Sequence, residues 1–202
     1  MRNIVDIRVM AHPSRADNVR RILDSLSVAD DIVIWDDREN GGDAMYTARK
    51  AWEYPAQEGY THRLVLQDDA EFCDGFISIA ERVAVSNPDK VVTFMHEGSI
   101  ESSERYEPFV FTVGCALMIP LKLIPKLWDF VDNRLQFYTG PMHDEIIKHD
   151  TTCIRLWMGN TGVQCVTTVP SLVQHIGDES LVGITRRRVS TDYTKTPPMD
   201  GW

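Results

Sequence analysis

The hydrophobic positions of the chain follow two periodicities, one typical of strands and one typical of amphipathic helices. Apolar residues spaced three or four positions apart predict helices between short apolar runs that predict strands. The predicted strands are 4–10, 31–35, 63–67, 91–95 and 109–119. The predicted helices carry the apolar faces Val19/Ile22/Leu23/Leu26, Ala44/Ala48/Ala51/Trp52, Phe76/Ile79/Ala80/Val83 and Ile124/Leu127/Trp128/Val131. This alternation predicts an α/β protein with a mainly parallel central sheet flanked by helices.

The size and composition fit one domain. The chain has 202 residues, 43% of them hydrophobic and 25% charged, which is enough for one well-filled core. We predict a domain over 1–188 and a loosely ordered tail over 189–202, which contains Thr, Lys and two adjacent prolines. The N-terminus mixes apolar and charged residues, unlike a signal peptide, and the apolar stretch 109–121 is too short to span a bilayer. These features predict a soluble, cytoplasmic protein without a membrane anchor.

Charge and cysteine spacing exclude several classes of site. A net charge of -9 disfavours a broad basic face for nucleic acid. Arg186, Arg187 and Arg188 form a local basic cluster, which is better explained as a solvated surface run. The four cysteines show no CxxC spacing, which favours reduced core thiols over a disulfide framework or a zinc cluster. The chain contains neither GxGxxG nor GxxxxGK[ST], so a dinucleotide fold or a P-loop is not supported.

Two adjacent carboxylates, Asp68 and Asp69, follow the apolar run 63–67. Ligands of a mainly parallel sheet bind beyond the carboxyl ends of its strands, where Asp36 and Asp37 also fall. Carboxylate oxygens suit hard divalent cations, and such a metal neutralises a diphosphate leaving group. Because aspartate is also common where strands stop, a solvated acidic turn explains the pair about equally well.

A second segment far down the chain adds a histidine. The apolar run that begins at Val169 releases His175 into a turn that contains Gly177. An imidazole nitrogen is a competent ligand for manganese-like ions, and glycine lets the backbone approach a ligand closely. Taken alone, His175 fits a hydrogen-bonded loop histidine better than a metal ligand.

Together these segments resemble the GT-A class of nucleotide-sugar glycosyltransferases, whose members carry an acidic DxD-type motif after a central strand and often a late metal-binding histidine. The matching residues are Gln67-Asp68-Asp69 and the run Pro-Ser-Leu-Val-Gln-His-Ile-Gly at 170–177. Gln67 stands where a strict motif has its first aspartate. The resemblance implies a single GT-A-like, Rossmann-like domain in which Asp69 and His175 hold Mn²⁺ or Mg²⁺ on the donor diphosphate. Asp68 would contact the ribose or the sugar.

The resemblance also implies a nucleotide site near the first strands. Ser14 and Arg15 would contact the nucleotide, Asp36 or Asp37 would bond the base or ribose, and Arg49 would reach the diphosphate. An ordinary surface role explains each of these residues about as well.

The acceptor hydroxyl needs a base to become a nucleophile. Asp144 and Glu145 stand at the start of a helix predicted to run to about residue 158, where acidic residues also stabilise the helix dipole. GT-A enzymes that invert the anomeric centre place an acidic base at such a helix start. By that resemblance Asp144 is the base and Glu145 the alternate.

The sequence thus predicts a metal-dependent, inverting glycosyltransferase that moves a sugar from a nucleotide diphosphate donor to a hydroxyl acceptor, which is a glycan, a small molecule or a modified DNA base. One rival is a phage-type enzyme that glycosylates a hydroxylated DNA base in the host cytoplasm, which the small size allows and the acidic charge disfavours. Another is a nucleotidyltransferase or phosphohydrolase that uses the same carboxylates, and a third is a sugar-nucleotide binding module without activity. Release of nucleoside diphosphate and sugar would favour glycosyl transfer, whereas release of pyrophosphate or phosphate would favour phosphoryl chemistry.

Overall fold

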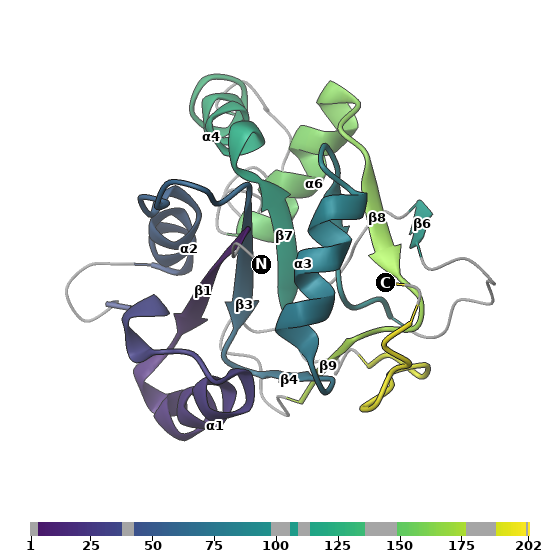
Figure 1. Cartoon of the computed structure of the whole chain (residues 1–202). Helices are drawn as coiled ribbons and strands as arrows, with labels where there is room; N and C mark the ends of the chain where they lie inside the picture. Colours follow the sequence, from purple (N-terminus) through teal and green to yellow (C-terminus); the bar gives the residue numbers. More distant parts are fainter. Residues whose placement is uncertain are drawn as a thin grey trace.

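The computed structural model of the chain describes residues 4–37, 43–97, 106–108, 114–135, 149–176, 189–200 and 202. At its centre is a seven-stranded sheet in the order β2-β1-β3-β7-β5-β8-β6 (Figure 1). Its strands are β1 (Val5–Ala11), β2 (Val33–Trp35), β3 (His62–Gln67), β5 (Val91–Thr93), β6 (Tyr106–Pro108), β7 (Ala116–Pro120) and β8 (Cys165–Thr168).

The strand directions decide the class of the sheet. β1 pairs in parallel with β2 and β3, and β5 pairs in parallel with β8. β7 runs antiparallel between β3 and β5, and β6 runs antiparallel to β8. β2, β1, β3, β5 and β8 therefore point the same way, which confirms the predicted α/β class and the mainly parallel sheet.

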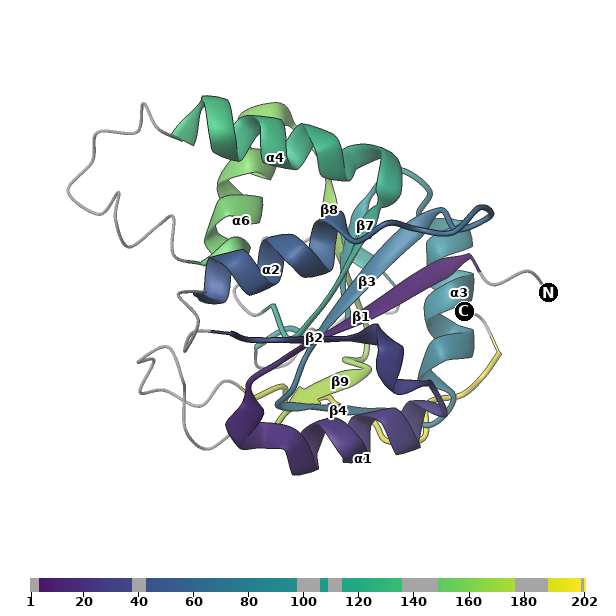
Figure 2. The same cartoon turned by 90° about the vertical axis from the view of Figure 1, so that its left-hand side faces the viewer.

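Helices cover both faces of the sheet. α1 (Ala16–Leu26) and α3 (Phe76–Ser86) contribute to one apolar cluster, and α2 (Ala44–Glu53), α4 (Ile124–Asn133) and α6 (Asp150–Thr161) contribute to another. Figure 2 shows α3 on one side of the sheet and α2, α4 and α6 on the other. Short 3-10 turns lie at Pro13–Arg15, Asp30–Ile32 and Leu121–Leu123.

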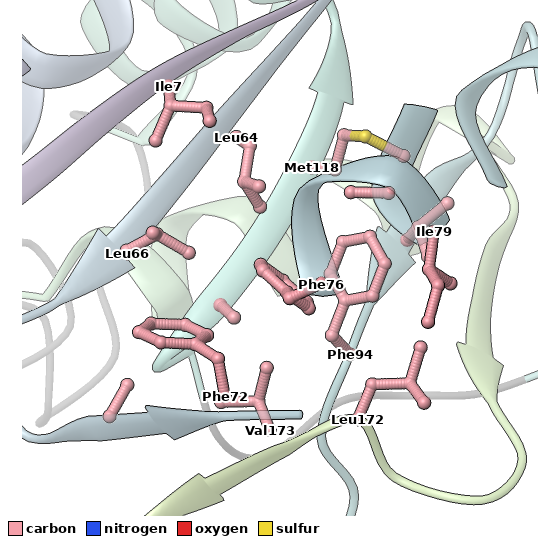
Figure 3. Packing of buried hydrophobic residues seen from close by; sticks show 14 of the residues in the cluster. Ile7, Leu64, Leu66, Phe72, Phe76, Ile79, Phe94, Met118, Leu172 and Val173 are labelled. Atoms are coloured by element: carbon pink, nitrogen blue, oxygen red, sulfur yellow. The ribbon is translucent and has the colours of Figure 1, made fainter. Parts of the chain in front are cut away.

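The core on the α3 face follows from the alternation of the strands. Leu64 and Leu66 point to this face because successive strand residues point to opposite sides. They pack around Phe76, which lies 4.9 Å from Phe72 and 5.1 Å from Phe94 between ring centroids (Figure 3). Each such side chain contributes about 1.5–3 kcal/mol by leaving water.

Charged residues are buried on the opposite face, where β1 presents Asp6 and Arg8 toward α2. Arg63 of β3 is 0% exposed, and its guanidinium pairs with Asp6 and donates to the carbonyl oxygens of Ala51 and Trp52 at 3.0 and 2.7 Å. Arg8 donates to Asp6 at 2.9 Å and lies over the Tyr54 ring at 3.8 Å. This network ties the last turn of α2 to the two central strands.

A separate two-stranded sheet pairs β4 (Ala70–Phe72) with β9 (Val173–His175) in antiparallel orientation. The apolar run that begins at Val169 contains β9 only from Val173 to His175, and the sequence did not predict the three-residue β4. Ala70 and Phe72 of β4 belong to the main core cluster, and three residues are too few to show the alternation of a strand. This small sheet carries the two segments on which the functional prediction depends.

Several predicted elements differ from the structure. β2 begins at Val33 because Asp30–Ile32 forms a 3-10 turn. β6 lies between the predicted strands 91–95 and 109–119, where the sequence predicted no strand, and it pairs with the edge of β8. A helix continuous through 144–158 is also wrong, since His149 is extended (φ -128°, ψ 117°) and α6 begins at Asp150.

All four cysteines are buried free thiols, as predicted. Across the described residues, every helix is too short or too polar to cross a membrane. The predicted domain boundary at 188 lies outside the described residues, so the division into domain and tail stays a prediction.

Candidate functional site

The carboxyl ends of β2, β1 and β3 meet at one edge of the sheet. The amide of Asp36 donates to the carbonyl oxygen of Ala11 at 2.7 Å, which holds the end of β2 beside the end of β1. The amide of His12 donates to Asp68 Oδ2 at 2.7 Å, which joins the end of β1 to the end of β3. The ends of these three strands are therefore hydrogen-bonded to one another at one edge of the sheet.

Asp68 and Asp69 form the turn between β3 and β4, where the chain leaves the main sheet for the small one. β9 pairs with β4 so that His175 lies opposite Ala70, and the amide of Ile176 donates to the carbonyl oxygen of Asp69 at 2.8 Å. As a result, His175 Nε2 lies 3.2 Å from Asp69 Oδ2. Two residues 106 positions apart are thereby brought into contact by a short strand pair.

Arg15 lies between the two carboxylates. Its Nη1 donates to Asp68 Oδ1 at 2.8 Å and to Asp69 Oδ2 at 2.7 Å. The 3-10 turn Pro13–Arg15 aims this side chain inward and is capped by His12, whose Nδ1 accepts from the Ser14 amide at 3.2 Å. Arg15 was predicted as a nucleotide contact, and the structure places it on the acidic pair itself.

The two carboxylates differ in proton affinity. Burial raises the pKa of Asp68, and the His12 amide and Arg15 offset this only in part. Burial also acts to raise the pKa of Asp69, but its hydrogen bond to His175 and the neighbouring charges of His175 and Arg15 outweigh burial, so that this pKa is lowered. The pKa of Arg15 is raised, since its bonds to the carboxylates outweigh the opposing effect of burial. Asp69 is therefore firmly ionised at neutral pH, as a metal ligand must be.

Two buried atoms at this contact have no hydrogen-bond partner, Asp69 Oδ1 and His175 Nδ1. A buried acceptor without a partner is costly, so an unpaired carboxylate oxygen beside a histidine is what a cation site offers. A spacing of 3.2 Å between Asp69 Oδ2 and His175 Nε2 also suits adjacent ligands of one ion, whose bonds are about 2.1 Å long for Mg²⁺. The residues present thus fit a divalent ion.

Within the described parts of the chain, no cluster of three or more His, Cys, Asp or Glu side chains able to hold a metal occurs, and Asp69 and His175 form a pair there. Ions such as Mg²⁺ keep several waters and bind through one or two carboxylates together with substrate phosphates. The donor set therefore suits an ion that arrives with a phosphate ligand.

The end of β2 provides a second group of predicted residues. Asp36 is buried, and the neighbouring Asp37 contacts Lys50 Nζ through Oδ2 at 3.3 Å while its buried Oδ1 has no hydrogen-bond partner. Trp35, the last residue of β2, is 43% exposed. An exposed aromatic ring is able to stack on a nucleobase. A carboxylate beside it is able to accept hydrogen bonds from the ribose hydroxyls.

Arg49 is placed elsewhere. Its guanidinium donates to Glu53 at 2.9 Å and to Asp132 at 2.7 Å, and it lies 4.9 Å from the Trp128 ring. These contacts join α2 to α4, so the described contacts of Arg49 do not bring it to Asp68 and Asp69. Gln67 ends β3, and its amide donates to the carbonyl oxygen of Cys115 at 2.9 Å. Asp144 and Glu145 lie outside the described residues.

The sequence did not single out Asp150, the first residue of α6. Its carboxylate accepts from Trp52 Nε1 at 3.1 Å and from the Thr151 amide at 2.7 Å, and burial raises its pKa. The start of α6 packs against Gly114, where an added Cβ would lie 2.0 Å from Thr151 Cγ2. In the sequence, the feature that could have singled out Asp150 was an acidic residue in a first helical turn. The same feature favoured Asp144 and Glu145 instead.

Comparisons with known proteins give distant likenesses only. No family model matches the chain, and no curated protein matches it. Among solved structures, the inositol-1-phosphate CTP transferase from T. maritima is 10% identical with a TM-score of 0.41, over 80% of this chain and 64% of that one. The chain thus spans less than two thirds of that protein.

Two further structures are similar at the same level. A putative glucose-1-phosphate thymidylyltransferase from Bacillus anthracis is 10% identical with a TM-score of 0.43, over 85% of this chain and 89% of that one. A mutant Drosophila β-1,4-galactosyltransferase 7 in complex with manganese, UDP-Gal and xylobiose is 10% identical with a TM-score of 0.38, over 85% and 71%. At these TM-scores the likenesses establish neither family nor activity.

Proposed function

We propose that the protein is a metal-dependent glycosyltransferase that moves a sugar from a nucleotide diphosphate donor to a hydroxyl acceptor. The observation that carries this proposal is the contact of Asp69 with His175 and Arg15 at the carboxyl end of β3, with Asp69 Oδ1 buried and unpartnered. An ionised carboxylate, an imidazole and a guanidinium together suit a cation bound to a diphosphate.

Each residue has a distinct role in this proposal. Asp69 and His175 hold Mn²⁺ or Mg²⁺, which when bound neutralises the charge of the diphosphate leaving group. Arg15 donates to phosphate oxygens, for which a guanidinium is well suited. Asp68 is oriented by the His12 amide and contacts the ribose or the sugar.

The nucleoside would lie along the ends of β1 and β2. Asp36 or Asp37 bonds the base or ribose, Ser14 lies beside the phosphates, and Trp35 offers a stacking face at 43% exposure. On the acceptor side, Asp144 removes the hydroxyl proton, with Glu145 as alternate, in an inverting reaction. Asp144→Asn is then expected to keep donor binding and to lose transfer by orders of magnitude.

Thermal shift with nucleoside diphosphates tests the donor assignment. A ligand that binds only the folded state raises the free energy of unfolding by about 2.7 kcal/mol at a concentration one hundred times its Kd. We expect at least one of UDP, GDP, CDP, ADP and dTDP to raise the melting temperature with Mn²⁺ present, and to lose this effect with EDTA. If none does so with Mn²⁺ or Mg²⁺, the donor assignment is wrong.

Matched variants then test the metal ligands. Asp69→Asn removes one charge at the site, and loss of a charged hydrogen-bonded contact of about 1.5–3 kcal/mol predicts roughly ten- to hundredfold weaker metal-dependent binding. Asp17→Asn removes the same charge from a side chain that is 98% exposed on α1, and it should leave metal-dependent binding unchanged. Full affinity in Asp69→Asn would exclude this residue as a ligand.

Product analysis separates the proposed reaction from its rivals. Nucleoside diphosphate and sugar released from a nucleotide sugar indicate glycosyl transfer with leakage to water. Pyrophosphate release indicates nucleotidyl transfer by the same carboxylates, and binding without turnover indicates a binding module. Transfer to duplex DNA that contains a hydroxymethylated base, but not to unmodified DNA, would identify the phage-type enzyme.

A further inference from the structure

The segment 189–200, called the strap here, contacts both strands of the small sheet, β4 through Lys195 and β9 through Ser190. The Ser190 amide donates to Gln174 Oε1 at 3.0 Å, and Gln174 Nε2 donates to the Ser190 carbonyl oxygen at 2.8 Å. Gln174 immediately precedes His175 in β9. β9 is therefore held by β4 through backbone pairing and by Ser190 through the side chain of Gln174. Figures 1 and 2 draw the strap in yellow.

The strap is fixed to the main sheet by a buried polar cluster, called the latch here. Asp192 Oδ2 contacts His96 Nε2 at 2.9 Å, and Asp192 Oδ1 accepts from Ser190 Oγ at 2.6 Å. Ser171 Oγ lies 3.0 Å from His96 Nδ1 and 2.8 Å from Ser190 Oγ. The latch joins the end of β5, the start of the β9 segment and the strap.

The latch contains a serine, a histidine and an aspartate in hydrogen-bond contact, as a nucleophilic triad does, but its surroundings exclude that role. Ser171 and His96 are both 0% exposed, so a substrate has no access to the hydroxyl. Ser171 Oγ also accepts from the His96 amide at 3.2 Å, which occupies it further. Buried polar groups that are fully bonded to one another fix a local structure.

We propose that the latch positions His175 against Asp69 by holding the strap on β9. β4 and β9 are three residues each, and an isolated pair of such short strands is marginally stable. The Gln174–Ser190 pair supplies a second attachment of β9, and Asp192 holds Ser190 in place. Asp192 and Gln174 are thus positioning residues for His175, and their effect on donor binding rests on the proposed function.

Two strap variants form a matched pair for the test. Asp192→Ala removes the contacts to His96 and Ser190, whereas Thr196→Ala removes a strap hydrogen bond of 3.0 Å to Asp74, away from β9. The first measurement is the ring ¹⁵N resonances of His175 by NMR, with His175→Gln used for assignment. In Asp192→Ala these resonances should move from their wild-type positions, because the ring no longer contacts Asp69. In Thr196→Ala they should stay at their wild-type positions.

The second measurement is the Kd for Mn²⁺ with the nucleoside diphosphate found by thermal shift, taken well below each melting temperature. We expect Asp192→Ala to weaken binding about tenfold and Thr196→Ala to leave it unchanged, because a loss of global stability alone does not alter the Kd of the folded fraction. Unchanged His175 resonances and unchanged Kd in Asp192→Ala would overturn the proposal.

Gln174→Ala opens the same connection from the side of β9, which keeps the test decisive if Asp192→Ala fails to fold. It should shift the His175 resonances in the same way, and combining both substitutions should add little, since either one releases Ser190. Additive effects would contradict a shared connection. If the wild-type protein binds no nucleotide with metal, the proposed function fails, and the His175 resonances still decide the positioning role.

Discussion

Asp68 and Asp69 are adjacent in the sequence, yet their surroundings give them opposite properties. Both are buried, but only Asp69 lies between two potential cations, Arg15 and His175. The pKa of Asp69 is lowered and that of Asp68 is raised. At the residue scale, the site therefore has one carboxylate suited to hold a cation and one that is held by donors from the end of β1.

This difference predicts the pH dependence of stability. An acid whose pKa is lowered on folding adds stability that is present above its unfolded pKa and is lost as pH falls through its folded pKa. For Asp69 this loss lies below the ordinary value of 3.8. Asp69→Asn should therefore lose less stability than the wild type in that range. The measurement is the free energy of unfolding in urea between about pH 2.5 and 7.

Asp68→Asn is the matched control for this experiment. An acid with a raised folded pKa destabilises the protein when ionised, and the penalty is relieved as pH falls through the folded value. Its removal should make the acid-induced loss slightly steeper. Identical profiles for the two variants would contradict the assigned environments.

At the element scale, α2 is attached to the sheet by buried charges. Arg63 neutralises Asp6 and binds the carbonyl oxygens of Ala51 and Trp52 at the end of α2, where a positive charge suits the helix dipole. In the sequence, Asp6 and Arg8 alternate with apolar residues near the N-terminus. The structure buries both residues, because Arg63 on the neighbouring strand pairs with Asp6.

Removing Arg63 should be strongly destabilising. Arg63→Ala leaves Asp6 buried with Arg8 as its remaining partner and strips two carbonyl oxygens of their donor, which predicts a loss of about 3–5 kcal/mol. The measurement is urea unfolding at neutral pH. Arg20→Ala, at a side chain 76% exposed, should cost less than about 1 kcal/mol. A comparable loss for both variants would show that the buried network contributes nothing specific.

The packing of α6 against the start of β7 gives a second prediction at this scale. A Cβ at Gly114 would lie 2.0 Å from Thr151 Cγ2, so Gly114→Ala should cost about 1–3 kcal/mol by overpacking. Adding Thr151→Ser removes that methyl group and should restore part of the loss. Chemical denaturation of the single and double variants measures this.

Gly159→Ala is the control on the same helix. A Cβ there meets nothing within 4 Å, and alanine in a helix interior is favoured over glycine by about 0.5–1 kcal/mol. This variant should therefore be more stable than the wild type. Failure of Thr151→Ser to restore Gly114→Ala would place the strain elsewhere than at the predicted contact.

At the scale of the whole molecule, the thiols report on global opening. All four are buried, and burial raises the pKa of Cys73, Cys153 and Cys165 to about 12 and raises that of Cys115 as well. The thiolate is the form that attacks a thiol reagent, so the folded protein should react very slowly. Modification by a disulfide reagent should follow the unfolded population as urea rises, and rapid labelling of any thiol in native buffer would contradict this packing.

The local sequence determined the order and type of most elements, since apolar periodicity is a property of neighbouring residues. It also placed Asp36, Asp37, Asp68 and Asp69 at strand ends, because strands of a parallel sheet deliver their ends to one edge. Only the tertiary structure decided which partners these residues meet. The contacts of Asp69 with Arg15 and His175 depend on a 3-10 turn and on two three-residue strands, which carry too little pattern to be predicted. The roles of Asp6, Arg63 and Asp192 were likewise invisible, because burial and ion pairing arise between segments far apart in the chain.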